Sequence, residues 1–358
     1  MAIGATTVSF SDIRTEFGGT GAVSISDYYR GGTKIRSKAA NNNGTNLAST
    51  VPTSGAVNFS DYRSTAKNFK YTFTSGATDQ NASDLFGDDY AVDYPKEIVI
   101  NSGVELGTTN TAEFGLEIDS GGSGTVKVTN NGTITGAGGA AASAGGDAVR
   151  VNLANVTIIN TGTIRGGGGG GGAGGLGGSG GTGGGGSYQT ANYTYSCGST
   201  SNCPNYEAYG ICAGGCAECD YRTNYRCTTY TTTNTNGGSG GSGGSGGAGA
   251  VGVGYNQSAG TGGSGLSGSA GSSGGTNAGT GGTGGTGGSG GNGGGFGSAG
   301  SNGTTGSTGG TGANGNRTNG LAGSAGSAGA SGGAAGRAVQ NDVSYTMTNT
   351  GTLTGLYN

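Results

Sequence analysis

Six cysteines are the residues of this chain whose type and spacing could support covalent or metal chemistry. They are Cys197, Cys203, Cys212, Cys216, Cys219 and Cys227, and all of them lie in residues 187–236. Such a density predicts a disulfide framework in an oxidising, extracellular setting. Zinc is the alternative, because Cys216 and Cys219 form a C-x-x-C, but a second close pair and any histidine are missing. A catalytic thiol is disfavoured as well, since no histidine is present to activate it.

The carboxylates of Glu113, Glu117 and Asp119 are the candidates for acid–base catalysis. Acidic residues scattered along strands usually lie on a solvated face. The sequence also lacks a metal-binding motif, a phosphate-binding G-K-[ST] and a catalytic triad. We therefore predict that the protein is not an enzyme and that it uses no cofactor and no metal.

Tyrosines are concentrated in the same segment as the cysteines. A tyrosine ring offers a large amphipathic contact area at a low entropic cost, which suits a binding surface. The alternative is that these rings pack inside the disulfide framework. The residues are Tyr188, Tyr193, Tyr195, Tyr206, Tyr209, Tyr221, Tyr225 and Tyr230.

The elements that must position this segment are rich in glycine. The chain has 358 residues, of which 92 are glycine, and stretches such as GTGGTGGTGGSGGNGG (279–294) hold glycine in three-residue phase. A flexible linker needs no period, whereas a three-residue helix needs glycine wherever a neighbouring helix approaches closely. We predict a bundle of about six antiparallel polyglycine-II helices, over residues 166–186, 237–252, 260–275, 279–295, 300–312 and 320–336. A disordered low-complexity stretch is the alternative.

Successive helices of such a bundle alternate in direction, so the segments that join them alternate between its two ends. One end then holds the insertion 187–236 together with Asn277, Asn314, Asn316 and Arg317. We expect these residues to form a distal recognition surface. Tyr255 and Phe296 belong to turns at the opposite, proximal end, where their rings are expected to pack on the rest of the protein.

Residues 71–165 and 337–358 form a β-repeat region. TVKVTNNGTITG (125–136), NVTIINTGTIRG (155–166) and SYTMTNTGTLTG (344–355) share one pattern, T-[VIM]-x-N-[NT]-G-T-[IL]-x-G. Short strands joined by Asn-Gly or Thr-Gly turns are typical of a β-solenoid or of stacked β-layers. Because the third copy follows the glycine-rich region, we expect the chain to return to the layer that it leaves near residue 166.

Residues 1–70 carry a shorter repeat, V-x-[FI]-S-D-[IY], at 8–13, 23–28 and 57–62. We expect a brief strand in each copy, followed by a helix with the Ser of the Ser-Asp pair as its N-cap. IRTEFGG (13–19) is predicted to be one such helix, ended by glycine. These small units either lie on the surface of a partner or form a local core.

The glycine-rich helices in three-residue phase, separated by variable loops, resemble the distal tail-fibre adhesins of T-even-type bacteriophages. The AGRAVQN…TNTGTLTG ending resembles the closing segments of glycine-rich phage tail-tip proteins, and VSFSDIRTEFGG and SISDYYRGG are similar to N-terminal segments common in phage tail structural proteins. The resemblance implies a virion protein that is extracellular on release. It implies that residues 1–70 attach to a phage tail or fibre protein and that the distal loops bind a protein or glycan receptor on the host surface. It also implies either a homotrimer or a single copy on a trimeric fibre. The cysteine-rich insertion departs from the short loops of that family, which leaves the type of receptor open.

Taken together, the sequence predicts a mainly β and irregular fold with N-terminal anchoring segments, a β-solenoid-like domain, the bundle and a disulfide-rich loop insertion. Two other functions fit this architecture. One is a non-adhesive structural subunit of a tail or filament, and the other is an ice-binding polyglycine-II protein, which would need a flat Thr/Ala face. The net charge of −3 argues against nucleic acid as a partner. The sequence contains no run of about 20 apolar residues, so it predicts no membrane-spanning helix.

Overall fold

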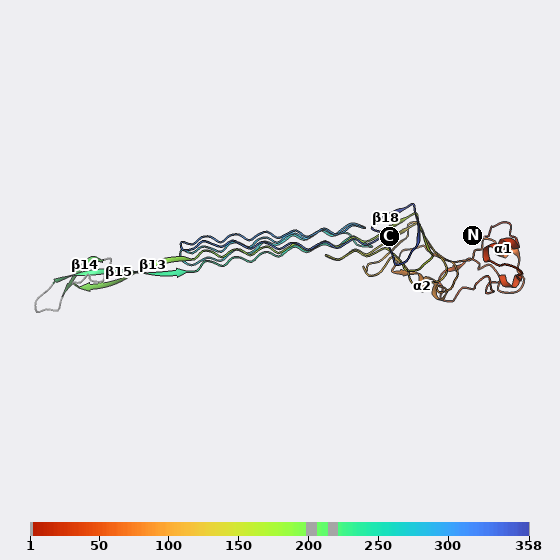
Figure 1. The fold of residues 1–358 in the computed structure, drawn as a ribbon, viewed down its shortest axis with the longest axis horizontal. Coiled ribbons are helices and arrows are strands. Elements are labelled where there is room, and N and C mark those ends of the chain that lie inside the picture. Colours follow the sequence, from red (N-terminus) through yellow and green to blue (C-terminus); the bar gives the residue numbers. More distant parts are fainter. Residues whose placement is uncertain (1–2, 198–205, 214–220, 358) are drawn as a thin grey trace.

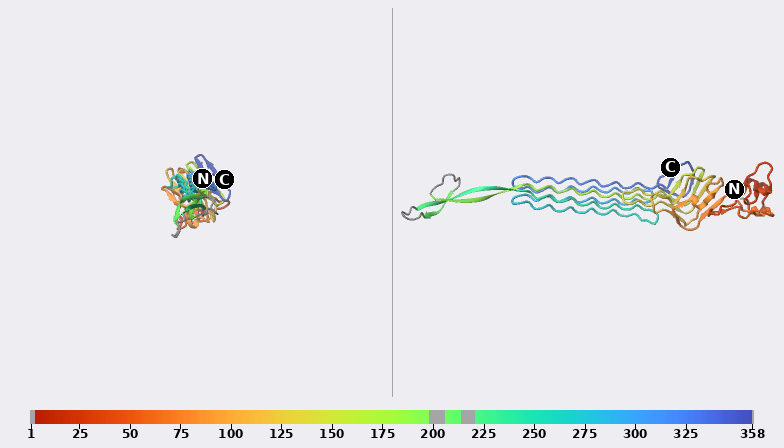
Figure 2. Two further views of the ribbon diagram at one scale, coloured as in Figure 1. Left: turned by 90° about the vertical axis from the view of Figure 1, so that its left-hand side faces the viewer. Right: turned by 90° about the horizontal axis from the view of Figure 1, so that it is seen from below.

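The computed structural model shows a long, narrow molecule (Figures 1 and 2). It describes residues 3–197, 206–213 and 221–357, and in the tip it describes side chains up to Thr194 and again from Arg226. Along the long axis lie, in order, a small N-terminal lobe, a β-domain, a bundle of extended segments and a sheet at the tip (Figure 1). The tip and the N-terminal lobe are therefore the two ends of the molecule.

The N-terminal lobe (residues 3–68) is built on three helix starts of the same design. α1 (Phe10–Phe17), η1 (Ile25–Tyr28) and η2 (Phe59–Tyr62) follow the N-cap residues Ser9, Ser24 and Asn58. In each case the backbone N–H of the cap donates to an aspartate three residues later, Asp12, Asp27 or Asp61, over 2.7–2.9 Å. The three copies of the motif are thus three capping boxes.

The predicted strand and N-cap in this motif are both wrong. The N-cap is the residue written x, so α1 begins at Phe10, before the expected cap Ser11. The spacing of Val8 and Phe10 was interpreted as strand alternation, but Val8 precedes the cap and packs against the cluster that contains Ile13. This contact is a hydrophobic staple, which uses the same spacing as a short strand. The predicted glycine stop is present, because the C-cap is Gly18 with a φ of 82°.

The lobe has its own core, as in the second of the two alternatives for residues 1–70. Ile13, Tyr28 and Tyr62 occupy the same place in the three motifs, and all three are fully buried. They cluster with Phe17, Ile35, Ala48 and Val51. The repeat therefore encodes one apolar side chain per helix start, and the three side chains meet in a common cluster.

The β-domain (residues 69–165 and 337–357) consists of three sheets whose strands stack as successive coils. The sheet orders are β1-β2-β5-β8-β11-β17, β18-β12-β9-β6-β3 and β16-β10-β7-β4. Every pairing is parallel except that of β1 with β2, which closes one end of the first sheet. The prediction of a mainly β fold is confirmed.

The bounds of these elements are as follows. The first sheet contains β1 (Thr45–Asn46), β2 (Phe69–Phe73), β5 (Lys96–Ile100), β8 (Val126–Asn130), β11 (Val156–Asn160) and β17 (Thr346–Asn349). The second contains β3 (Ala77–Thr78), β6 (Glu105–Gly107), β9 (Thr133–Thr135), β12 (Thr163–Arg165) and β18 (Thr352–Thr354). The third contains β4 (Gln80–Asn81), β7 (Leu116–Ile118), β10 (Val149–Val151) and β16 (Val339–Asn341), and α2 (Ala82–Phe86) and η3 (Gly87–Asp89) follow β4.

The twelve-residue repeats stack directly on one another in this domain. Ile158 pairs in register with Val128 on one side and with Met347 on the other. At the following turn the side chains form a ladder, in which Asn130 Nδ2 donates to Asn160 Oδ1 and Asn160 Nδ2 donates to Asn349 Oδ1, each over 2.7 Å. A buried apolar face and an asparagine ladder thus set the register, and a shift by one residue would expose both.

The glycine-rich region is an insertion within one coil of the β-domain. The chain leaves after β12 at Arg165 and returns in β16, which pairs with β10 in the register Val149↔Val339. Arg150 reinforces the return, because its guanidinium lies 3.0 Å from Glu117 and 2.8 Å from Asp342. Both ends of the inserted bundle are therefore held by one rigid layer.

The bundle consists of six segments, and neighbouring segments are joined by backbone hydrogen bonds that recur at every third residue. They are termed here the first (166–186), second (237–252), third (260–275), fourth (279–295), fifth (300–312) and sixth (320–336) segments. The first segment bonds to the second, fourth, fifth and sixth, and the fourth bonds to the first, second, third and fifth. This pattern describes two layers of three, with the third, fourth and fifth segments in one layer and the second, first and sixth in the other.

Neighbours in the bundle do not all run antiparallel. Segments that follow one another in the chain are antiparallel, but the second runs parallel to the fourth, as in the bonds from Gly238 to Gly279 and from Gly241 to Gly282. The first and fifth segments are also parallel. Alternation along the chain therefore produces parallel contacts between the two layers.

The number of glycines in each triplet follows the position of a segment in this array. The first and fourth segments, which have four neighbours each, carry two glycines in most triplets, whereas the third and sixth, with two neighbours, mostly carry one. A Cβ added at Gly174 would overlap the carbonyl oxygen of Gly288, and one added at Gly175 would overlap that of Ser327. Glycine is thus required on each side of a segment on which another backbone packs.

The tip is a three-stranded antiparallel sheet of order β13-β15-β14. β13 (Gly186–Cys197) and β15 (Tyr221–Thr235) continue the first and second segments as one long ribbon, and β14 (Tyr206–Ala213) pairs with the far part of β15. Where the sequence predicted a loop, the described residues 186–197 and 221–235 are strands. Their Thr and Tyr side chains favour an extended backbone. The loop was predicted from the density of cysteines, and this β-propensity was not taken into account.

Candidate functional site

The distal end of the bundle brings together three turns that lie far apart in the sequence. Ser187 is their meeting point, because its N–H donates to Asn316 Oδ1 over 2.8 Å and its carbonyl accepts from Asn316 Nδ2 over 2.9 Å. Asn277 Nδ2 donates to the same carbonyl over 3.1 Å. The N–H of Asn316 in turn donates to the Asn277 carbonyl over 3.1 Å. The base of the tip is therefore a closed polar network and not a set of independent loops.

Two further bonds attach the ribbon to the bundle. Thr235 Oγ1 donates to the Thr276 carbonyl over 2.7 Å, and the N–H of Arg317 donates to the Gly185 carbonyl over 3.1 Å. The Arg317 side chain is exposed at this end. Asn314 Oδ1 accepts from the N–H of Gly320 over 2.9 Å, so this amide closes its own turn. Among the predicted distal residues, Asn277, Asn314 and Asn316 position the backbone, and Arg317 faces solvent.

The ribbon divides the tyrosines between its two faces. Tyr193 and Tyr230 lie on one face, because Tyr193 is opposite Thr228 and Ala191 is opposite Tyr230. Both side chains are more than half exposed, at 52% and 56%. Tyr188, opposite Thr233, is displaced from Tyr193 by an odd number of residues and lies on the other face, where it is half-buried.

Arg226 joins the face that carries Tyr193 and Tyr230. Its guanidinium carbon lies 4.9 Å from the centre of the Tyr193 ring, a distance at which a cation is attracted to the ring. Sequence reasoning missed this residue, because the contact depends on the register of two strands that are distant in the chain. The face therefore combines two aromatic rings, a guanidinium group and the hydroxyls of Thr228 and Thr232, so it is both aromatic and polar.

Several predicted site residues fall outside the described side chains. They are Tyr195, Tyr206, Tyr209, Tyr221, Tyr225, Cys197, Cys203, Cys212, Cys216 and Cys219. Cys227 is disulfide-bonded. The pairing of the six cysteines stays a prediction.

The proximal turns hold the other end of the bundle against the β-domain. The guanidinium carbon of Arg165, in β12, lies 3.8 Å from the centre of the Phe296 ring. Tyr255 covers Gly107 in β6, where its ring fills the space that a Cβ would need, and its N–H donates to the Gly136 carbonyl over 3.1 Å. These two aromatic contacts fix how the bundle leaves the sheet.

Two of the three carboxylates considered for catalysis, Glu117 and Asp119, have structural partners. Glu117 Oε1 lies 3.0 Å from Arg150 Nη1, and burial raises the pKa of Glu117 in spite of this partner. Asp119 Oδ1 accepts from the N–H of Ser83 over 3.1 Å, and its carbonyl accepts from Tyr90 Oη. Glu117 and Asp119 therefore connect neighbouring coils of the β-domain.

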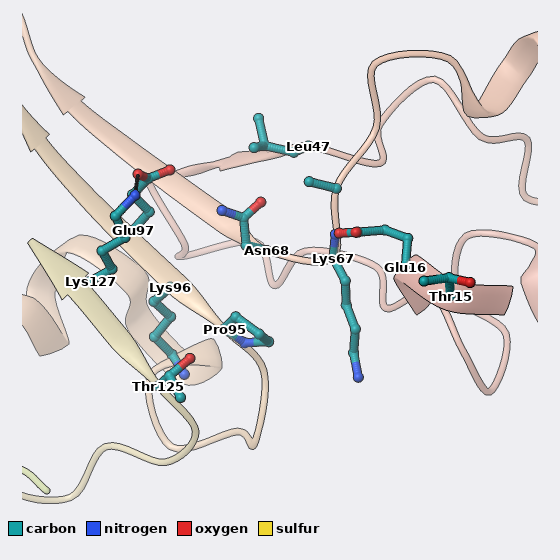
Figure 3. A pocket seen from close by; sticks show the side chains of 11 residues that line it. Thr15, Glu16, Leu47, Lys67, Asn68, Pro95, Lys96, Glu97, Thr125 and Lys127 are labelled. Atoms are coloured by element: carbon teal, nitrogen blue, oxygen red, sulfur yellow. Dashed lines mark hydrogen bonds and ion pairs between the residues drawn. The ribbon is translucent and has the colours of Figure 1, made fainter. Parts of the chain in front are cut away.

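A pocket of about 540 Å³ lies where the N-terminal lobe meets the β-domain (Figure 3). Lys127 pairs with Glu97 at 3.0 Å, and Glu16 accepts from the backbone N–H of Lys67 over 2.8 Å. The Lys67 Nζ lies 5.8 Å from the centre of the Tyr94 ring. Burial lowers the pKa of Lys96 to about 8, and its Nζ donates to the carbonyls of Val92, Tyr94 and Ser123 over 2.8–2.9 Å. The pocket thus lies at the boundary between the N-terminal lobe and the β-domain, and several of its lining residues bond to other parts of the protein.

No helix in the described ranges is both long and apolar enough to cross a membrane. Comparison with curated proteins and with solved structures finds no match. A family model described as phage tail fibre adhesin Gp38 matches residues 64–244, which include strands β2 to β12, the first segment of the bundle and the whole tip. This match covers half of the chain and includes both the layer that holds the bundle and the surface at its far end. The chain therefore belongs to the phage tail fibre adhesin Gp38 family.

Proposed function

We propose that this adhesin binds a host-cell surface receptor through its tip, and that the bundle is a rigid polyglycine-II stalk. The N-terminal lobe attaches the protein to the phage tail or fibre. In this proposal the ribbon face with Tyr193, Tyr230 and Arg226 contacts the receptor. The disulfide framework stiffens the part of the tip beyond it. The protein performs no catalysis.

The observation that carries this proposal is the position of the tip. It is the end of a long molecule opposite the N-terminal lobe (Figures 1 and 2), and its base is held by the bonds that Ser187 makes with Asn277 and Asn316. A receptor-binding surface must project from the particle and must keep its orientation. The exposed tyrosines of a ribbon that is hydrogen-bonded at its base support the proposal on both counts.

The polyglycine-II geometry of the stalk is supported by the hydrogen bonds. Bonds recur every third residue between neighbouring segments, as in the donors Gly174, Gly177 and Gly180, which bond to Gly247, Gly244 and Gly241 over 2.8–2.9 Å. A helix with three residues per turn presents one residue of each triplet to each neighbour. Because backbone groups make these bonds, the stalk is stabilised without an apolar core.

A structural spacer is the competing function, and removal of the ribbon separates it from the adhesin. We would replace residues 190–231 by Asn-Gly, a two-residue hairpin turn. This keeps the pairs from Gly186↔Thr235 to Gln189↔Thr232, and with them the bonds at the base of the tip. For an adhesin, the particles assemble but adsorb to host cells at least about tenfold more slowly, because a binding surface of this kind supplies several kcal/mol.

Point variants provide matched controls in the same assay. The double variant Tyr193→Ala, Tyr230→Ala should slow adsorption, whereas Tyr188→Ala, on the opposite face, should change it much less. Normal adsorption by intact particles that lack the ribbon would show that the bundle is only a spacer. If the Tyr193→Ala, Tyr230→Ala double variant and Tyr188→Ala slow adsorption equally, the receptor does not bind specifically to the proposed face.

A further inference from the structure

Seven asparagines of this chain are followed directly by glycine. An Asn-Gly pair can deamidate spontaneously, because glycine gives the backbone the freedom to bring its N–H nitrogen onto the asparagine side chain. A glycine N–H that donates a hydrogen bond must first release it, so the tertiary structure sets which pairs are reactive. The pairs begin at Asn43, Asn131, Asn236, Asn292, Asn302, Asn314 and Asn319.

In six of these pairs the glycine N–H donates a hydrogen bond within the protein. Backbone carbonyls accept, over 2.9–3.2 Å, from Gly293, Gly303 and Gly315. Asparagine side chains accept, over 2.7–3.2 Å, from Gly44, Gly132 and Gly320. Each of these nitrogens is therefore engaged in the folded state.

The pair Asn236-Gly237 lacks this protection. Neither the Gly237 N–H nor the Asn236 side chain is hydrogen-bonded to another residue that the structure describes, and the Asn236 side chain is exposed. The carbonyl of the same peptide group accepts from the Gly275 N–H over 3.0 Å. A donor at this oxygen stabilises the anion that forms when the Gly237 N–H loses its proton. The attacking nitrogen is thus both free and activated.

Asn236 lies where the ribbon joins the stalk. The last pair of the ribbon is Gly186↔Thr235, and the second segment of the bundle starts at residue 237. Packing fixes the residue that follows Asn236 as glycine, because a Cβ at Gly237 would overlap the Gly183 carbonyl oxygen. One of the two chain connections between tip and stalk therefore runs through this Asn-Gly pair.

We propose that Asn236 and Gly237 form a site of spontaneous deamidation at the base of the tip. The deprotonated Gly237 nitrogen bonds to Asn236 Cγ while the Cγ–Nδ2 bond breaks, and Nδ2 takes up protons from water and leaves as ammonia. Water then opens the succinimide ring, at Cγ to give aspartate or at the main-chain carbonyl to give isoaspartate. Both products add a negative charge, and isoaspartate also adds one atom to the backbone of this connection. The reaction is independent of the receptor-binding role proposed for the tip.

The test incubates the full-length protein at mildly alkaline pH. Mass spectrometry with electron-transfer fragmentation then measures aspartate and isoaspartate at each of the seven positions. Asn236 should convert at least about fivefold faster than the other six, since each of those pairs must first break a hydrogen bond. In the reduced and unfolded protein all seven should convert at similar rates, because every glycine N–H is then free. Asn236→Gln should block the reaction at this position, since glutamine would have to close a larger ring.

Asn319 provides the matched control. Its side chain is exposed as well, but the N–H of the following Gly320 donates to Asn314 Oδ1 over 2.9 Å. Asn314→Ala removes this acceptor and should raise the conversion of Asn319 toward the rate of Asn236. Circular dichroism verifies that the variant is folded.

Three outcomes would overturn the proposed site. The first is that Asn236 stays unconverted in the folded protein, and the second is that it converts no faster than Asn319. The third is unchanged conversion of Asn319 in Asn314→Ala, because the hydrogen bond to the glycine N–H would then not control the reaction.

Discussion

At the scale of single residues, the lobe depends on tyrosines that are buried with their hydroxyls. Tyr62 is fully buried, and its Oη donates to the Tyr28 carbonyl over 3.1 Å. Burial, aided by the nearby charge of Asp61, raises the pKa of Tyr62 to about 12. An unfolded tyrosine titrates near pH 10. The folded state therefore disfavours the tyrosinate, and stability depends on pH in the alkaline range.

The stabilising effect of this group is fully present below about pH 10 and is lost as the pH rises toward 12. We predict that the thermal unfolding temperature of the lobe falls over this interval. Tyr62→Phe should cost about 1 kcal/mol at neutral pH through the lost hydrogen bond, but should make the fall at high pH shallower. Melting curves at a series of pH values test this, with the exposed Tyr193→Phe as the control. Equal pH slopes for the protein and Tyr62→Phe would contradict it.

At the scale of elements, the bundle is a case in which composition encodes packing. Each segment presents glycine toward its neighbours and Ser, Thr, Ala or Asn toward solvent, as with Gly285 and the adjacent exposed Thr286. A Cβ at Gly285 would overlap the Ser307 carbonyl oxygen. Thr286, by contrast, contributes only its backbone N–H and carbonyl to bonds with Ser307.

This contrast between neighbouring positions gives a direct test of the packing. Gly285→Ala should destabilise the bundle by about 1–3 kcal/mol or more, the usual cost of overpacking. Thr286→Ala should change stability by less than about 0.5 kcal/mol, as exposed substitutions do. Chemical denaturation followed by circular dichroism compares the two. A Gly285→Ala variant as stable as Thr286→Ala would mean that the segments do not pack backbone to backbone.

At the scale of the whole molecule, this member of the phage tail fibre adhesin Gp38 family has its N-terminal lobe and its tip at opposite ends. The stalk is tied to the β-domain at Arg165 and Val339 and closed at the tip by the Ser187 network. Among the residues that the structure describes, the hydrogen bonds within the stalk do not involve the ribbon beyond Gln189 and Thr232. The order of the stalk should therefore be independent of the tip.

Amide hydrogen exchange measures this independence. In the variant with residues 190–231 replaced by Asn-Gly, amides such as Gly241, Gly244 and Gly282 should stay protected as in the intact protein, because their acceptors lie within the bundle. Amides that face solvent should exchange fast in both. Exchange of residues 237–336 at the rate of a free peptide, in either protein, would rule out a rigid stalk.

The sequence by itself determined those features that depend on local pattern and repetition. The three-residue phase of glycine marked the six segments, the twelve-residue repeat marked the stacked strands, and alternation placed Asn277 and Asn316 at one end. Each of these follows from a period or from chain order. The capping boxes of the lobe were also encoded locally, but their spacing was interpreted as strand alternation, which the same residues can satisfy.

Only the tertiary structure decided how these pieces meet. The division into two layers of three, the parallel neighbours, the face shared by Tyr193 and Tyr230, and the contact of Arg226 with Tyr193 depend on pairings between distant residues. The same holds for the contacts of Tyr28 with Phe10 and Tyr62, and of Tyr62 with Phe17, in the N-terminal lobe. A period identifies which side of a segment is in contact, but it does not identify the partner, because every glycine-lined side offers the same backbone groups.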